Sequence, residues 1–510
     1  MLKKLYQDIS EEHNLRADLI ALKKELKKEG SKQAFCSMID GEPYVFIELL
    51  KHSEAKVRKN AALVLGELNL AASLEPLFLA YKEETQLFIR SDYLKAMANM
   101  DYGPYLLQLQ DRLKELVKMQ PKENEKKHIW EETTLLQKLI LQKRGAPKHL
   151  FIGIEEEFEI ILTTNRLFRE VTARQIPDTK INLIPAGVKA ITRNLDHIKE
   201  IRTYKELLFT LNCDKKLTED PQEIARELAN SNLLFILRKA YGEQEQFYFR
   251  IGIHGAMPLD KRSMFLKRCS FALEELTNRK LVNTASDYEI ELRLIQGRDD
   301  TFYPVLKLHT LEDNRFSYRK NVVAASIQPS LAALIIKLSA PYLKADARVL
   351  DPFCGVGTML IEREIQKPAK TMYGIDILEE AIDKAKENTM LARETIVPTQ
   401  EGITSICQQI YYTNRDCFRF AQEYLFDEII TNMPARGKKS RNWQDSLYEN
   451  FFTMADRMLA EEAIIILYSD EMGLVKKHLR LNKGFILEEE YCLNEKEGFY
   501  LFIIRKKDII

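Results

Sequence analysis

The sequence lacks the features that most readily assign a chain to a class. Its 510 residues include seven scattered cysteines without a CxxC pair, so neither a disulfide framework nor a zinc site is predicted. Eight dispersed histidines suggest no metal cluster. No run of about 18 apolar residues occurs, which excludes an ordinary membrane span. The N-terminus has no apolar core of the kind that a signal peptide needs. We therefore expect a cytoplasmic protein that needs no metal.

An excess of charge of either sign is also missing. Lys and Arg together number 76, and Asp and Glu together number 76, so the formal net charge is zero. A balanced chain has no general attraction to nucleic acid, and any such site must be a local basic patch. The length itself favours about three domains.

Residues 1–145 show no alternation typical of strands. Apolar residues recur at spacings of three and four, which predicts helices. The segment KVRKNAALVLGEL from Lys56 is echoed by FIRSDYLKAMANM from Phe88, and Arg58 matches Arg90. This echo resembles HEAT-type repeats, and an ordinary helical bundle is the alternative. Either module would bind a protein partner or stiffen the chain.

The pattern of the sequence changes after the stretch 142–153, which contains Gly and Pro and which we interpret as a linker. Residues 151–318 mix short alternating strands, among them EEEFEIILTTNRLFREVTARQI, with helical segments, and this predicts an α+β region. Residues 319–510 alternate helices with seven strand candidates: RVLDPF, MYGIDI, IYYTNRD, DEIITNMP, AIIILYS, FILEEEYCL and GFYLFIIRKK. That order predicts a doubly wound α/β domain with ligands at the carboxyl ends of its strands.

The segment RVLDPFCGVGTMLIE contains the most specific motif of the chain. An apolar strand ends at Asp351, and Gly355 and Gly357 would let the backbone approach a ligand closely. Thr358 begins a helix whose free amide groups favour anions, and it is a candidate cap. The dinucleotide pattern G-x-G-x-x-G fails at Leu360, which disfavours NAD. An acid before the loop can instead meet the ammonium group of S-adenosylmethionine.

Two further acids follow the next two strands. Asp376 ends the second strand about 20 residues after Gly357, the spacing at which an acid binds ribose hydroxyls. The alternative is that Asp376 caps the helix beginning at Glu379. Asp416 ends the third strand, where an acid can accept a hydrogen bond from an adenine amino group. Together the three acids indicate a nucleoside-containing cofactor.

The fourth strand leads into the loop TNMPARGKKS. Asn432, Met433 and Pro434 resemble the Asn-Pro-Pro-aromatic loop of methyltransferases that modify planar amino nitrogens. An amide oxygen and a loop carbonyl can accept both N–H bonds of such an amine, which directs its lone pair at the methyl donor. Ala435 replaces the aromatic residue that usually stacks on the base, and the Arg436 guanidinium could stack in its place. A degenerate, inactive loop is the alternative.

These motifs resemble the THUMP-associated RNA guanine methyltransferases, through the segments IGIHGAMPLDKRSMF, ASDYEIELRL, FSYRKNVVAASIQPSLAALI, DPFCGVGTMLIE, YGIDI, NRDCF and TNMP. The resemblance implies a THUMP-like RNA-binding region over 151–318 and a class I methyltransferase domain over 319–510. In such enzymes the helix leading into the pocket would carry Ser326, Gln328 and Pro329. The implied cofactor-binding set also includes Asp351, Cys354, Gly355, Gly357, Thr358, Asp376, Ile377, Asp416 and Cys417. Arg319 and Arg436 are implied substrate contacts.

The family methylates the 2-amino nitrogen of guanosine, mostly in tRNA and in some members in ribosomal RNA. We therefore expect guanosine methylation in structured RNA, with tRNA as the partner and S-adenosylmethionine as the cofactor. Two alternatives stay open. One is an adenine or cytosine amino methyltransferase that uses the same loop type. The other is a non-catalytic RNA-binding or scaffold protein, for which Ala435 and the extra helical region are the motives.

Overall fold

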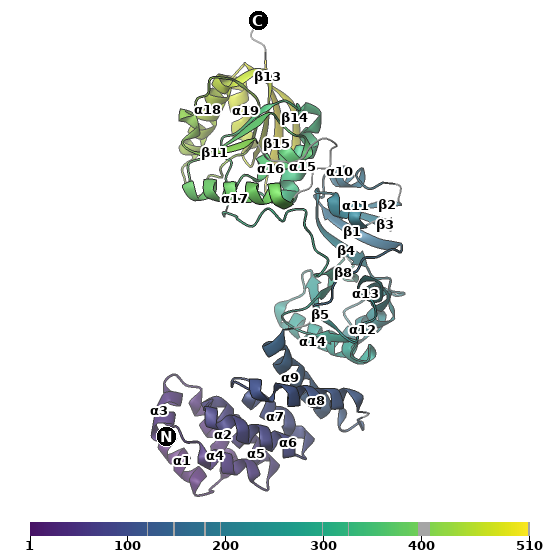
Figure 1. The fold of residues 1–510 in the computed structure, drawn as a ribbon, viewed down its shortest axis with the longest axis vertical. Coiled ribbons are helices and arrows are strands. Elements are labelled where there is room, and N and C mark those ends of the chain that lie inside the picture. The colour runs from purple at the N-terminus through teal and green to yellow at the C-terminus, as the bar shows by residue number, and fades with distance from the viewer. Residues whose placement is uncertain are drawn as a thin grey trace. The chain divides into compact units, whose positions relative to one another are not determined.

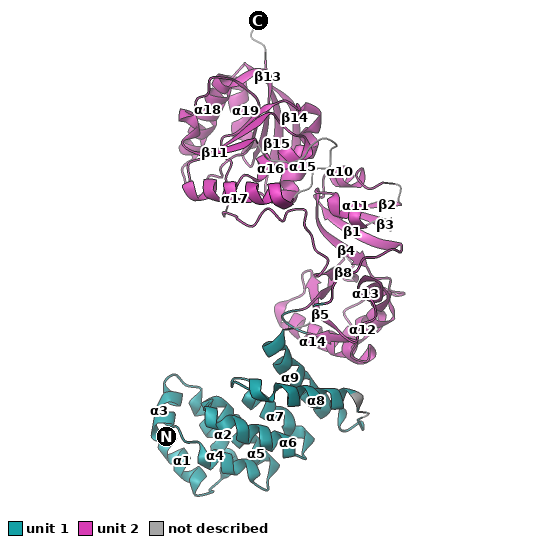
Figure 2. Cartoon of the chain, viewed as in Figure 1, with its two compact units in different colours: residues 1–148, 284–287 teal, residues 149–283, 288–510 magenta. Residues whose placement is uncertain are grey.

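The computed structural model describes residues 1–507 except 120, 146–147, 178–179, 194, 298, 325 and 396–408. It separates into two compact units, which Figure 2 shows in different colours. The first comprises residues 1–148 with 284–287, and the second comprises residues 149–283 with 288–510. Cys407 and two residues of the predicted linker, 146 and 147, lie outside the described residues.

The first unit is built of helices over the stretch for which the apolar spacing predicts them. They are α1 Leu2–Ser10, α2 Leu15–Leu26, α3 Ser31–Met38, α4 Tyr44–Glu48, α5 Ala55–Leu68, α6 Leu74–Glu83, α7 Leu87–Met97, α8 Leu106–Lys118 and α9 Lys126–Arg144. Their apolar faces form one core, with Leu19, Leu65 and Leu94 fully buried. Burial of such faces is the main source of stability for short helices.

The two arginines that the sequence aligns make equivalent contacts. The Arg58 guanidinium donates to the backbone oxygen of His52 at 2.8 Å and to the Glu84 carboxylate at 2.8 and 2.9 Å. Arg90 donates to the backbone oxygen of Glu84 at 2.6 Å and to the Glu132 carboxylate at 3.0 Å. Each arginine therefore binds a carbonyl six residues earlier and a carboxylate later in the chain.

The second unit begins with one eight-stranded sheet in the order β2-β3-β1-β4-β8-β7-β5-β6. Its first half is β1 Phe158–Thr164, α10 Arg169–Ala173, β2 Ile181–Ile184, β3 Gly187–Thr192, α11 Leu195–Glu200 and β4 Tyr204–Thr210. This βαββαβ order is ferredoxin-like. Its second half is α12 Pro221–Asn230, α13 Leu233–Tyr241, β5 Phe247–His254, α14 Leu259–Leu276, β6 Leu281–Asn283, β7 Ile290–Gln296 and β8 Phe302–Leu308.

One part of this region differs from the sequence-based expectation. The stretch 155–176 is typical of strands in sequence, yet only β1 forms there and α10 follows it. The reason is a turn at Asn165, whose side-chain oxygen accepts a hydrogen bond from the amide of Leu167 at 2.9 Å. Such Asx turns end a strand because the side chain replaces the backbone partner.

The last part of the second unit is a seven-stranded sheet in the order β11-β10-β9-β12-β13-β15-β14. The strands are β9 Arg348–Asp351, β10 Thr371–Asp376, β11 Ile410–Asn414, β12 Phe426–Asn432, β13 Leu459–Ser469, β14 Phe485–Asn494 and β15 Phe499–Lys506. The first five in this order run parallel, whereas β15 is antiparallel to β13 and to β14.

Helices cover both faces of this sheet (Figure 1). The helices are α15 Pro329–Ser339, α16 Thr358–Gln366, α17 Glu379–Thr395, α18 Arg441–Met458 and α19 Met472–Leu481. Residues of α15, α16 and α17 share one core with the sheet, and residues of α18 and α19 share another. The strand order reverses between β9 and β12, and ligands bind at such a switch point in open α/β sheets.

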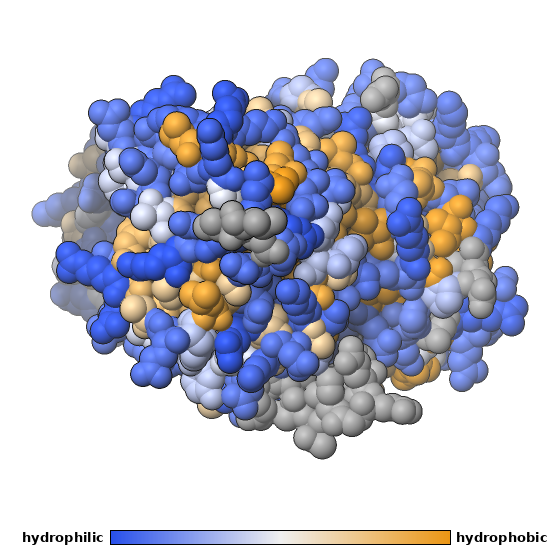
Figure 3. All heavy atoms as spheres, turned by 90° about the horizontal axis from the view of Figure 1, so that it is seen from above, coloured by the Kyte–Doolittle hydropathy of each residue, from blue (hydrophilic) through white to orange (hydrophobic). Residues whose placement is uncertain are grey.

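The two sheets of this unit are linked by a buried carboxylate on α16. Glu362 accepts two hydrogen bonds from the Arg202 guanidinium, at 2.7 and 2.8 Å, and one from the Tyr318 hydroxyl at 2.7 Å. The surface seen in Figure 3 is mainly hydrophilic, with apolar side chains in small groups. Among the described helices, none is long and apolar enough to cross a membrane.

Candidate active site

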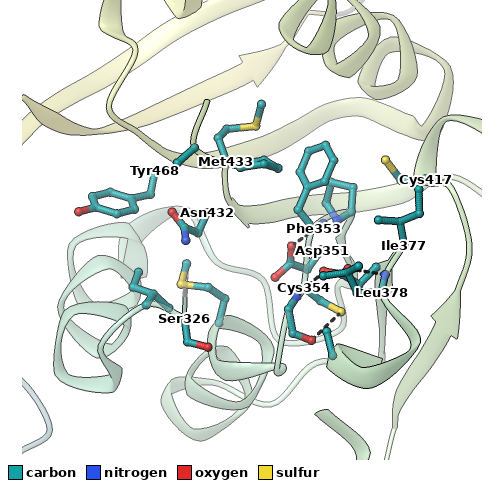
Figure 4. A pocket seen from close by; sticks show the side chains of 18 of the residues that line it. Ser326, Asp351, Phe353, Cys354, Ile377, Leu378, Cys417, Asn432, Met433 and Tyr468 are labelled. Carbon is teal, nitrogen blue, oxygen red and sulfur yellow. Dashed lines mark hydrogen bonds between the residues drawn. The ribbon is translucent and has the colours of Figure 1, made fainter. Parts of the chain in front are cut away.

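A cavity of about 970 Å³ lies at the carboxyl ends of β9, β10 and β12 (Figure 4). The loops after these three strands and after β11 meet there, together with the segment before α15, the end of β13 and the start of β15. The switch point of the sheet therefore coincides with a hollow that can admit a ligand.

Asp351, the last residue of β9, is 1% exposed. Its Oδ1 accepts hydrogen bonds from the Thr431 hydroxyl at 2.7 Å and from the amide of Phe353 at 3.1 Å. Burial raises the pKa of this carboxyl to about 7, since none of the described cations pairs with it. A buried carboxyl in this state favours a cationic ligand group, which would restore the charged form.

The two glycines of the loop are both needed by its geometry. Gly355 has a φ of +52° and its amide donates to Asp376 at 3.0 Å, while the space where a Cβ would stand is open. Gly357 has a φ of +82°, and a Cβ there would lie 2.4 Å from the Tyr412 hydroxyl. Only glycine adopts such conformations without strain.

Thr358 does not cap the helix, contrary to the expectation. Gly357 is the capping position of α16, and no side chain bonds there. The Thr358 hydroxyl lies in a residue that is 2% exposed, and it has no hydrogen-bond partner among the described atoms. Because Thr358 also lines the cavity, its unsatisfied hydroxyl is available to a ligand.

The acids after the next two strands both line the cavity. Asp376 ends β10 and accepts hydrogen bonds from the amides of Gly355 and Leu378, so it braces the loop rather than capping α17 at Glu379. Asp416 does not end a strand, because β11 stops at Asn414. Its side chain accepts a hydrogen bond from the amide of Phe418 at 3.0 Å and caps a short 3-10 turn.

The segment before α15 also differs from the expectation. Only Pro329 lies on this helix, because Gln328 is its capping residue and Ser326 precedes it. The Ser326 hydroxyl accepts a hydrogen bond from the amide of Val323 at 2.9 Å, which holds the segment as a turn. Ser326 and Gln328 line the cavity, and Pro329 does not.

The end of β12 places Asn432 at the cavity. The amide of Met433 donates to the backbone oxygen of Tyr468 at 2.9 Å, which extends the pairing of β12 with β13 past the strand end. The Asn432 side chain makes no hydrogen bond with another described residue, and Figure 4 shows it beside Tyr468, its register partner on β13. Its amide is therefore free to bind a ligand.

Most of the predicted residues come together around this one cavity. Those that line it are Ser326, Gln328, Asp351, Cys354, Gly355, Thr358, Asp376, Ile377, Asp416, Cys417, Asn432, Met433 and Pro434. Those that do not are Arg319, Pro329, Gly357 and Arg436. Arg319 is engaged by the protein itself, since its guanidinium donates to the backbone oxygen of Ile327 at 2.9 Å.

Several residues that line the cavity are not predicted from the sequence. Aromatic side chains of this kind are Phe353, Trp443, Tyr468 and Phe499, and polar ones are Lys439, Asp470 and Glu497. Lys439 lies over the Trp443 ring at 3.7 Å from its centroid. The polar residues Ser469 and Asp470 after the apolar run of β13 are the sequence feature that could have revealed this side.

The donor and acceptor set fits S-adenosylmethionine. Asp351 matches a cationic ammonium group, and the Thr358 hydroxyl at the start of α16 matches a carboxylate. Asp376 and Asp416 have oxygens that can accept from ribose hydroxyls and an adenine amine. Ile377 and Leu378 line the same side and are 72% and 60% exposed, so apolar surface is available to a purine ring.

Comparison with known proteins finds similarity over the C-terminal part of the chain. Residues 317–485 match the family described as RMKL-like, methyltransferase domain. The ribosomal RNA large subunit methyltransferase K/L of Acinetobacter baumannii (strain AYE) is 25% identical over 193 residues, 36% of this chain and 26% of that protein. The tRNA (guanine(10)-N2)-dimethyltransferase of Methanothermobacter thermautotrophicus is 27% identical over 170 residues, 31% of this chain and 44% of that protein. The chain thus spans less than half the length of these curated relatives.

Solved structures resemble a larger share of the chain. TrmN from Thermus thermophilus has a TM-score of 0.51 at 18% identity and covers 69% of this chain and 100% of its own. SMU.472, solved in complex with SAH, has a TM-score of 0.51 at 12% identity and covers 70% of this chain. The C-terminal sheet thus has the class I methyltransferase fold.

Proposed function

We propose that this chain transfers a methyl group to the exocyclic 2-amino group of guanosine in structured RNA, most simply tRNA. The observation that carries the proposal is the free Asn432 side chain at a cavity whose buried Asp351 lacks a cation. The first group suits a planar amine, and the second suits the cofactor. The Asn432 amide and the Asp351 carboxyl therefore line the same cavity.

Asp351, Thr358, Asp376 and Asp416 would hold the cofactor, because all four line the cavity and a carboxylate oxygen can accept more than one hydrogen bond. When bound, S-adenosylmethionine supplies a methyl group attached to a positively charged sulfur. Asp351 would neutralise the ammonium group, and the start of α16 with Thr358 would receive the carboxylate. These contacts would orient the cofactor in the cavity.

Asn432 and the loop carbonyl at Met433 would accept the two N–H bonds of the target amine. That geometry takes the nitrogen lone pair out of conjugation with the ring and points it at the methyl carbon. Methyl transfer would form the C–N bond as the S–C bond breaks, and the amine would then release one proton to water. The base must first leave its stack to enter the pocket.

The printed names of the relatives support RNA as the substrate, because one modifies ribosomal RNA and the other modifies tRNA. The loop after the catalytic segment adds a local basic patch in a chain without net charge. Arg436, Lys438, Lys439 and Arg441 are all exposed there. Such cations suit the phosphates that flank an inserted base.

The other parts of the chain would grip the same RNA or bind a partner. We propose three modules: a HEAT-like region over 1–145, a THUMP-like region over 151–318 and the methyltransferase domain over 319–510. Within the second module, Lys261, Lys267 and Arg268 are exposed on α14 and suit phosphates. These assignments rest on the resemblance and on the repeated arginine contacts of α5 and α7.

Purified protein tests the proposal directly. With labelled cofactor it should methylate total tRNA and leave duplex DNA unlabelled, and the product should be N2-methylguanosine. Asn432→Ala should lower the rate of transfer by about 10² to 10³ fold, since it removes one preorganised acceptor. Cofactor affinity, measured by calorimetry, should stay unchanged. An unchanged affinity would show that the variant is folded.

Two observations keep other functions in competition. Ala435 in place of an aromatic favours a scaffold protein, which would bind the cofactor tightly yet add no methyl group to any cellular RNA. The loop type is shared with adenine and cytosine amino methyltransferases, which would yield N6-methyladenosine or N4-methylcytidine. Analysis of the methylated nucleoside separates all three.

A further inference from the structure

One side of the cavity lies beyond Asn432 and is formed by the ends of β13 and β15. Asn432 on β12 is the register partner of Tyr468 on β13, and the amide of Met433 donates to the Tyr468 oxygen at 2.9 Å. Register partners in neighbouring parallel strands place their side chains on the same face of a sheet. The Tyr468 ring therefore stands next to the Asn432 amide, as Figure 4 shows.

This side carries a stacked aromatic pair. The rings of Tyr468 and Phe499 have centroids 5.1 Å apart and an angle of 17° between their planes. Tyr468 is 6% exposed, and its hydroxyl has no hydrogen-bond partner among the described residues. Phe499 is partly buried, and like Tyr468 it lines the cavity.

Two carboxylates complete the same side. Asp470 follows β13 directly, and Glu497 lies in the turn between β14 and β15, where Asn494 donates to one of its oxygens at 2.8 Å. Both line the cavity. Burial raises the pKa of the Tyr468 phenol far above its usual value, and the negative charges of Glu497 and Asp470 raise it further.

We propose that Tyr468, Phe499, Asp470 and Glu497 form the subsite for the target base and that this subsite selects guanine. The inference rests on the proposed function and deepens it. The stacked rings take the place of the aromatic residue missing at Ala435. A base that stacks on Phe499 has its amine beside Asn432 and its ring edge toward the carboxylates.

The chemistry of the base edges explains the choice. Guanine presents a ring N1–H donor next to its 2-amino group, so a carboxylate can accept from it. Adenine and cytosine instead present a ring nitrogen lone pair next to their amines. Ionised carboxylates only accept hydrogen bonds, so they would face that lone pair without a partner. An acceptor that a bound base covers and leaves without a partner is costly, which makes such a site discriminating.

The test uses the full chain, total tRNA from cells that lack the protein, and mass spectrometry of the nucleosides formed. Phe499→Ala should lower kcat/KM for N2-methylguanosine formation by about tenfold to hundredfold, the range expected for one lost stacking contact. Phe499→Tyr should keep the rate. Adding Ala435→Phe to Phe499→Ala should restore most of it, which a purely structural role of Phe499 does not predict.

The double variant Asp470→Asn and Glu497→Gln tests the edge contacts. It should lower N2-methylguanosine formation by at least about tenfold, the value of a charge-assisted hydrogen bond, while cofactor affinity by calorimetry stays unchanged. Wild-type rates in both Phe499→Ala and the double variant would overturn the subsite alone. N6-methyladenosine as the wild-type product would overturn guanine selection. No methyl transfer to RNA by the wild type would overturn the proposed function, and the subsite with it.

Discussion

The helical unit and the cavity of the C-terminal sheet treat buried charge in opposite ways. In the helical unit Glu132 is fully buried, and it accepts hydrogen bonds from Tyr81 at 2.7 Å and from Arg90 and Arg112 at 3.0 Å. Asp351 at the cavity is equally buried but has hydroxyl and amide partners only. A buried carboxylate with cationic partners is part of the structure, whereas one without them indicates a ligand.

The same contrast holds inside the methyltransferase domain. Arg363 and Glu428 are both buried, and the guanidinium donates to the carboxylate at 2.8 and 2.9 Å. This pair joins α16 to β12 away from the cavity. Burial by itself therefore does not mark a site, and the missing partner does.

Removing a paired charge should give the largest effect. Glu132→Ala leaves two arginines without their carboxylate and should destabilise the helical unit by about 3–5 kcal/mol. Tryptophan fluorescence can follow each unit separately, because Trp130 lies on α9 and Trp443 lies at the cavity. Urea unfolding of a Trp443→Phe background, followed by Trp130 fluorescence, would measure the loss.

An exposed pair provides the matched control for that experiment. Lys114 and Asp111 are 72% and 71% exposed and 3.3 Å apart. Lys114→Ala should change the unfolding free energy by less than about 1 kcal/mol, since exposed pairs contribute little. A comparable loss in both variants would break the distinction between paired and solvated charges.

Removing the unpaired charge of Asp351 should have the opposite effect on stability. Asp351→Asn should weaken S-adenosylmethionine binding by about 2–5 kcal/mol, because the ammonium group loses its partner. Without ligand it should stabilise the protein above pH 7. The folded carboxyl, with a pKa of about 7, binds its proton more tightly than the unfolded one. That contribution to stability is full at low pH and is lost as pH rises through 7.

Calorimetry and thermal unfolding at pH 6 and pH 8 would check both signs. Stability that falls in Asp351→Asn at pH 8 would show that Asp351 is a structural residue. Asn retains an acceptor for the Thr431 hydroxyl, so that bond does not confuse the result.

The pH dependence of cofactor binding sharpens the same point. Because the cofactor needs the charged form of Asp351, its affinity should fall by up to tenfold for each pH unit below about 7. Titrations from pH 5 to pH 8 would show this slope, and Asp351→Asn should remove it. A flat profile in the wild type would exclude ionised Asp351 from cofactor binding.

The smallest effect is expected at Thr358. Thr358→Val keeps the shape of the side chain and removes a hydroxyl that has no partner in the protein. It should leave folding stability unchanged or slightly higher, yet weaken cofactor binding by about 0.5–1.5 kcal/mol. Destabilisation without loss of affinity would place the hydroxyl in the fold rather than the site.

The sequence predicts residues at strand ends well, because the end of an apolar run followed by an acid or Asn is a local pattern. Asp351, Asp376 and Asn432 all end strands of the seven-stranded sheet and meet at its cavity. Asp416 was placed at a strand end that lies two residues earlier, since polar residues follow β11 without a break in the pattern.

Residues that strand pairing alone brings to the site cannot be predicted from such a local pattern. Tyr468 and Phe499 are aromatics in apolar strands and look like core residues in the sequence, and only the register of β12, β13 and β15 brings them to Asn432. The strand β2 is also not predicted from the sequence. It has four residues, and its two central residues, Asn182 and Leu183, are exposed. Its pattern does not alternate, so no strand is predicted there.

The central proposal is that the cavity formed by Asn432 and the unpaired groups around it is the site at which guanosine in RNA is methylated. Mass spectrometry of tRNA nucleosides from cells with the protein, without it, and with Asn432→Ala in its place tests this most directly. We predict that N2-methylguanosine falls in the second and third strains alike and returns with the wild-type chain. Equal N2-methylguanosine in all three strains would contradict the account.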